Sequence, residues 1–99
     1  CLTLWVTNLL ERNVPNDEVF ASVSELLETI RWSAAHVVIV TNELGLGLVP
    51  MDAGGRRFRE LAGRVNQQVA EEADEVYLVV SGLPVRIKST NISRSRKPR

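Results

Sequence analysis

The chain has 99 residues, of which 44% are hydrophobic and 24% charged, and this composition fits one small globular domain. Its net charge of zero combines −6 over residues 1–83 with +6 over residues 84–99. The apolar runs are far shorter than the roughly 20 residues of a membrane-spanning helix, so we expect no membrane span. A single cysteine cannot form an internal disulfide, and no secretory signal is visible, so we expect a cytoplasmic location.

Two helices are predicted in the first third of the chain. Leu2, Trp5 and Leu9 recur at helical spacing, which predicts a helix over 2–12. Pro15 disfavours helical structure at the residue before it, so the chain should break over 13–16. A second helix over 17–32, capped by Asn16 or Asp17, places six apolar residues on one face. They are Val19, Phe20, Val23, Leu26, Leu27 and Ile30.

An unbroken apolar, β-branched run over 36–41 predicts a strand buried on both faces, as in a parallel sheet. A loop over 42–50 follows it and contains Gly45 and Gly47. The polar residues Thr41, Asn42 and Glu43 therefore stand at the carboxyl end of a predicted strand, where open α/β sheets bind their ligands.

Two interpretations remain open for this stretch. Thr41 and Asn42 either contact a ligand or tie down the following loop through hydrogen bonds to its backbone. Gly45 and Gly47 either let the backbone approach a ligand or supply the positive φ of a tight turn. The hydroxyl of Thr3, near the start of the first helix, either reaches the same site or caps that helix.

A third helix of about 20 residues is predicted to begin after Asp52 and to end near Ala73. Its buried stripe comprises Phe58, Leu61, Ala62, Val65 and Val69. Its arginines, Arg57 and Arg64 among them, either reach a phosphate or form a solvated face. A second buried strand is predicted over 75–81. A turn is predicted over 82–84, and a short final strand over 85–88.

Residues 89–99 contain one apolar residue and several basic ones, so we expect a disordered basic tail after a folded part over 1–88. Basic charge attracts nucleic acid, but the tail has no interleaved aromatic residues and no recognition motif. We therefore favour a solvated extension that binds no nucleic acid.

Four blocks of sequence, 1–10, 38–50, 57–67 and 73–84, together resemble one known family. The most specific part is Thr41-Asn42-Glu43-x-Gly45-x-Gly47-x-Val49-Pro50, followed by Phe58-Arg59-x-x-x-Gly63-x-x-Asn66-Gln67. These blocks are similar to the C-terminal half of the bifunctional adenosylcobinamide kinase / adenosylcobinamide-phosphate guanylyltransferase family of cobalamin biosynthesis.

The resemblance implies the C-terminal part of a RecA-like P-loop NTPase, an α/β fold with a mostly parallel sheet flanked by helices. The full-length enzyme phosphorylates adenosylcobinamide and then transfers GMP from GTP to adenosylcobinamide phosphate through a histidine–guanylate intermediate. GTP or ATP with Mg²⁺ is implied as its cofactor, and a homo-oligomer as its assembly. The nucleotide- or substrate-proximal candidates in this chain are Thr41, Asn42, Glu43, Gly45, Gly47 and Thr3.

The chain has no counterpart of the family's phosphate-binding loop, and His36 does not match the guanylylated histidine. Phosphoryl transfer depends mostly on positioning and on charge stabilisation by that loop and Mg²⁺. We therefore expect no catalytic residue and no metal site in these residues, no tight nucleotide binding, and no activity of the chain alone. The alternative is a non-catalytic interaction module derived from that enzyme.

Overall fold

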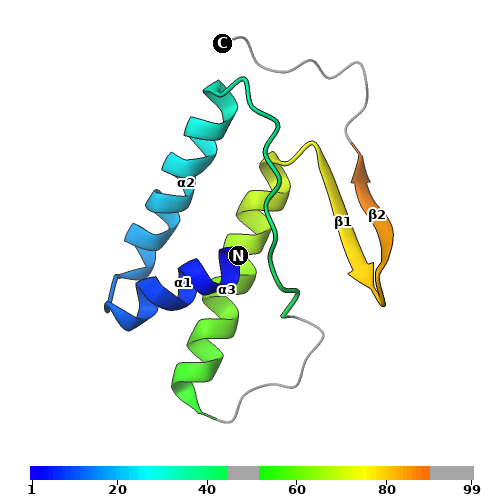
Figure 1. Cartoon of the computed structure of the whole chain (residues 1–99). Coiled ribbons are helices and arrows are strands. Elements are labelled where there is room, and N and C mark those ends of the chain that lie inside the picture. Colours follow the sequence, from blue (N-terminus) through cyan, green and yellow to red (C-terminus); the bar gives the residue numbers. More distant parts are fainter. Residues whose placement is uncertain (45–51, 90–99) are drawn as a thin grey trace.

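The computed structural model describes residues 1–44 and 52–89. Three helices and a hairpin follow one another in the chain: α1 (Leu2–Glu11), α2 (Asn16–Trp32), α3 (Ala53–Glu72), β1 (Glu75–Val80) and β2 (Leu83–Ser89). In Figure 1, α1 and α2 lie on one side of α3, and the hairpin projects from the carboxyl end of α3 on the other side. Gly45, Gly47 and residues 90–99 of the predicted tail lie outside the described residues, whereas Ser89, predicted as the first residue of that tail, is the last residue of β2.

The three helices enclose the core, as their helical periodicity predicts. α1 begins and ends within one residue of its predicted bounds, and α3 has its predicted length. Eight apolar side chains on the facing stripes are at most 8% exposed: Leu2, Val6, Val19, Val23, Leu61, Ala62, Val65 and Val69. Phe58 packs against them, half-buried. Among the described residues, no helix is long and apolar enough to cross a membrane.

The helix starts differ in how they are capped. Asp52 caps α3 as predicted, because its carboxylate accepts a hydrogen bond from the backbone N–H of Gly55 at 3.1 Å. The predicted cap of α2 was wrong, since α2 begins after Pro15 and no side chain caps it. The side-chain oxygen of Asn16 instead accepts a hydrogen bond from Arg57 of α3 at 2.9 Å, so it joins two helices.

Asp52→Ala is expected to lower the free energy of unfolding by about 1 kcal/mol, because it leaves an amide of the first turn of α3 without its acceptor. Urea unfolding followed by circular dichroism measures the effect. Asp52→Asn is the matched control: it keeps an acceptor oxygen and should lose only a few tenths of a kcal/mol, about the helix-dipole contribution of the charge. Equal losses in the two variants would show that the cap itself contributes nothing.

The prediction of a doubly buried strand over 36–41 was wrong. The segment is extended but has no strand partner among the described residues, and Val38 and Val40 are 78% and 65% exposed. A backbone hydrogen bond joins it to α1, from the N–H of Leu2 to the carbonyl of Val40 at 2.9 Å. A strand of a parallel sheet is buried only when neighbouring strands and helices cover it, and the described residues supply no neighbouring strand.

The second predicted strand exists as β1, but it is neither parallel nor buried. It pairs antiparallel with β2, and Val80 stands opposite Leu83 across the two-residue turn of Ser81 and Gly82. Both turn residues have positive φ, 51° and 77°, which suits the twist of a tight hairpin. The turn is therefore shorter than the predicted 82–84. A two-stranded sheet cannot bury both of its own faces, which explains the exposure of Val79 and Val85.

Candidate functional site

Three of the predicted site residues lie together, joined by hydrogen bonds. Thr3 of α1 is buried, and its hydroxyl oxygen lies 3.2 Å from that of Thr41 in the extended segment. The backbone N–H of Asn42 donates to the Thr3 hydroxyl at 3.1 Å. Glu43 follows directly and is exposed. Glu43 is thus the carboxylate that directly follows Asn42, whose backbone the group binds.

Asn66 of α3 completes this group, although the sequence reasoning did not assign it to the site. Its side-chain oxygen accepts from the Thr41 hydroxyl at 2.7 Å, and its side-chain nitrogen donates to the carbonyl of Asn42 at 2.9 Å. The signal available in the sequence was an amide directly after Val65, a member of the predicted buried stripe, in the middle of an amphipathic helix. An amide there needs hydrogen-bond partners from another element.

The packing of the core explains why these side chains meet. Leu2 and Val65 are both buried in the core, so Thr3 and Asn66, their neighbours in sequence, emerge at the same edge of it. The bond from Leu2 to Val40 sets the extended segment against the start of α1. The arrangement favours a structural interpretation for the Thr41 hydroxyl, because both of its hydrogen-bond neighbours are protein side chains.

The arginines of α3 contact α2. The Arg57 guanidinium donates to Asn16, and the Arg64 guanidinium lies over the ring of Phe20, 4.6 Å from its centroid. These contacts surround a hollow of about 60 Å³ that Glu60 also lines. The contacts are consistent with a role in packing α3 on α2, and they do not bring either arginine to Thr41.

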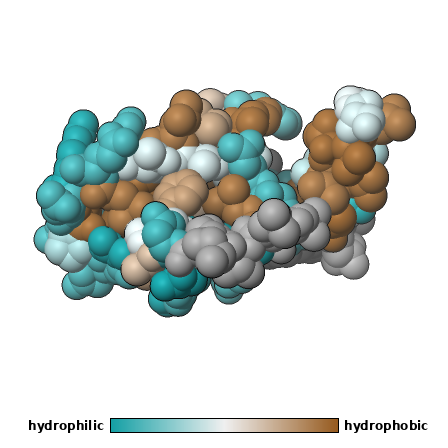
Figure 2. Space-filling view, turned by 90° about the horizontal axis from the view of Figure 1, so that it is seen from below, coloured by the Kyte–Doolittle hydropathy of each residue, from teal (hydrophilic) through white to brown (hydrophobic). Residues whose placement is uncertain are grey.

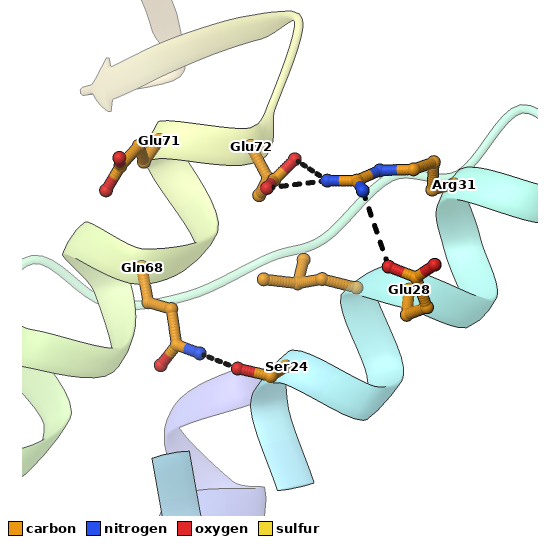
Figure 3. Close-up of a pocket in the computed structure, with 7 residues that line it drawn as sticks. Ser24, Glu28, Arg31, Gln68, Glu71 and Glu72 are labelled. Atoms are coloured by element: carbon orange, nitrogen blue, oxygen red, sulfur yellow. Dashed lines mark hydrogen bonds and ion pairs between the residues drawn. The ribbon is translucent and has the colours of Figure 1, made fainter. Parts of the chain in front are cut away.

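A larger hollow of about 240 Å³ lies between α2 and α3, and Figure 3 shows Arg31 bonded to Glu72 and Glu28, and Gln68 bonded to Ser24. The Arg31 guanidinium donates to both carboxylate oxygens of Glu72, at 2.8 and 2.9 Å, and also contacts Glu28 at 3.4 Å. The hydrogen bond to Glu72 raises the pKa of Arg31. Gln68 donates to the Ser24 hydroxyl at 2.8 Å. The bonds from Arg31 to Glu72 and from Gln68 to Ser24 connect the two helices, so these side chains are engaged in helix packing.

Known proteins match nearly the whole part of the chain that the structure describes. The family model described as cobinamide kinase / cobinamide phosphate guanyltransferase matches residues 1–87. Two bifunctional adenosylcobalamin biosynthesis proteins named CobU, from Salmonella typhimurium and Escherichia coli, are 44% and 42% identical to this chain. Each match covers 89% of this chain and 55% of the relative's own length. CobP of Pseudomonas aeruginosa is 39% identical over 89% of this chain and 50% of its own. The chain spans about half the length of the curated relatives it matches.

Proposed function

This chain belongs to the cobinamide kinase / cobinamide phosphate guanyltransferase family, and we propose that it forms the C-terminal half of such an enzyme. The complete enzyme would phosphorylate adenosylcobinamide and transfer GMP from GTP to adenosylcobinamide phosphate, in the cytoplasm and as a homo-oligomer. Its fold would be the RecA-like P-loop fold, in which residues 36–41 and β1 join a mostly parallel sheet. The match over residues 1–87 carries this proposal.

Exposed apolar side chains support the proposed sheet. Seven valines, leucines and isoleucines on the extended segment and the hairpin are more than half exposed: Val38, Val40, Val79, Val80, Leu83, Val85 and Ile87. Figure 2 shows the hydrophobic surface of the hairpin standing apart from the helices. Apolar strands of this kind are normally covered on both faces in a parallel sheet. In the complete enzyme, further strands and helices would cover them.

The proposed contribution of this chain to catalysis is positioning. The group formed by Thr3, Thr41, Asn42 and Asn66 would hold the strand end from which Glu43 and the loop with Gly45 and Gly47 face the nucleotide or the corrinoid substrate. Mg²⁺ would neutralise charge on the nucleotide phosphates. The described residues contain no group of three carboxylate, histidine or cysteine side chains that could hold a metal ion. In the proposed complete enzyme, the nucleotide phosphates and the N-terminal half would supply most of the ligands of Mg²⁺.

A fusion protein tests the proposal. The part of Escherichia coli CobU that precedes the matched region is joined to residues 1–99, and phosphorylation of cobinamide and transfer of GMP are assayed. We expect activity in the fusion and none in residues 1–99 alone, because the sequence lacks the phosphate-binding lysine loop. Intact Escherichia coli CobU is the positive control. A folded fusion without either activity, or an active isolated chain, would contradict the proposal.

A second candidate is a non-catalytic interaction module, which the same exposed apolar side chains favour. In this case residues 1–99 would form a stable assembly with a partner through the extended segment or the hairpin. Size-exclusion chromatography with light scattering, together with pull-downs from the native cells, tests the module. A strict monomer that captures no partner would eliminate it.

A further inference from the structure

The four hydrogen bonds around Asn42 form a closed ring with a defined direction. Asn42 enters the ring twice, through its backbone N–H, which donates to Thr3, and through its carbonyl, which accepts from Asn66. Thr3 contacts Thr41, and Thr41 contacts Asn66. Every member therefore touches two others, and both backbone groups of one residue are bound.

The chemistry of the groups fixes which atom donates in each bond. A carbonyl only accepts, so the side-chain nitrogen of Asn66 must face Asn42, and its oxygen must face Thr41. The single hydroxyl proton of Thr41 is then used toward Asn66. The bond between the two threonines consequently requires Thr3 to donate and Thr41 to accept. All four bonds point the same way around the ring, an arrangement in which neighbouring bonds polarise and strengthen one another.

We propose that Asn66 is the positioning residue of the candidate site: it closes this ring and thereby sets the direction in which the chain leaves Asn42 toward Glu43. The inference rests on the proposed function, because it assigns Asn66 to the same site. Asn66 is suited to the task because α3 is anchored next to it by buried Val65 and Val69. The residue acts through Asn42 and Glu43 and needs no contact with the substrate.

The ring requires an amide at position 66. Only a side chain with an acceptor and a donor side by side can receive the Thr41 proton and donate to the Asn42 carbonyl. An ionised aspartate has the same shape and accepts from Thr41, but it cannot donate, and it places negative charge against a carbonyl oxygen. Asn66→Asp is therefore a sharper probe than Asn66→Ala, because it removes the bond to the Asn42 carbonyl while it keeps the shape of the side chain and the bond from Thr41.

Amide hydrogen exchange of residues 1–99, measured by NMR, tests the ring without reference to activity. We expect the Asn42 amide to exchange about tenfold faster in Asn66→Asp, the equivalent of losing one net hydrogen bond. Gln67→Glu is the matched control: it makes the same amide-to-carboxylate change on the adjacent, exposed residue and should leave Asn42 unchanged. Unaltered exchange of core amides such as Val23 confirms that the variants fold.

Variants of Thr41 provide a second, independent test. Thr41→Val removes the hydroxyl that joins Thr3 to Asn66 and should also accelerate exchange at Asn42, whereas Thr41→Ser keeps the hydroxyl and should restore slow exchange. Thr41 is exposed, so neither change threatens folding. Slow exchange at Asn42 in both Asn66→Asp and Thr41→Val would overturn the ring.

The enzyme assay of the fusion separates this inference from the proposed function. In an active fusion, Asn66→Asp should lower kcat/KM about tenfold or more, while Gln67→Glu should not. Fast exchange at Asn42 with undiminished kcat/KM would leave the ring intact as a structural feature and overturn the positioning role. An inactive wild-type fusion would instead contradict the proposed function, and the exchange data would still decide the ring.

Discussion

Leu61→Ala is expected to lower the free energy of unfolding by about 3 kcal/mol. Leu61 is 2% exposed and lies in the core cluster between α1, α2 and α3, so truncation leaves a cavity that the surrounding helices cannot fully close. Small domains are stable by only about 5–15 kcal/mol, so this loss is a large fraction of the total. Urea unfolding, followed by circular dichroism at the helix band, measures it.

Leu4→Ala is the matched control, since it removes the same atoms from a leucine of α1 that is 63% exposed. We expect a change below about 0.5 kcal/mol there. The comparison isolates burial, because side-chain chemistry and helix propensity change equally in the two variants. Equal losses at both positions would show that the core does not lie where the three helices meet.

The second large effect is expected at Val38, and only in the proposed fusion. In residues 1–99 the side chain is 78% exposed, so Val38→Asp should leave the free energy of unfolding nearly unchanged. In the fusion the same residue would lie inside the sheet, where an unpaired carboxylate costs several kcal/mol. We expect Val38→Asp to reduce the activity of the fusion at least about 100-fold.

Val38→Ile is the control for this experiment, because it retains an apolar, β-branched side chain and should keep most of the activity. Both variants are compared for soluble yield, melting temperature and activity, in the fusion and in the isolated chain. A fusion that tolerates Val38→Asp would show that the extended segment stays outside the sheet, and this outcome would contradict the proposed P-loop architecture.

The helices were predictable because the information that forms them is local. Periodicity placed α1 and α3 within a residue of their observed bounds, and Asp52 was identified as a cap from its position alone. The side-chain cap predicted for α2 was wrong, and Asn16 instead bonds to Arg57, which is 41 residues away in the sequence. Such a contact follows from helix packing, which a sequence pattern does not specify.

Strand burial could not be predicted because it depends on contacts with segments that are distant in the sequence. The composition of 36–41 correctly indicates an extended chain, but burial depends on which segments lie beside it. At the site, Thr3, Thr41 and Asn42 were identified from their places at element ends and from the family resemblance, and the structure brings them together. Asn66 was missed because its role depends on two bonds to residues 24 and 25 positions away.

The hydrogen-bonded ring also has a consequence for the order in which the molecule folds. Its bonds join residues 24 to 39 positions apart, whereas the β1–β2 hairpin closes over two residues. Closing a short hairpin takes about 1–10 μs, and longer loops cost more entropy. We therefore expect the helices and the hairpin to form early and the ring to close only after α3 has docked. During synthesis, residues 36–44 would remain without these contacts until Asn66 has left the ribosome.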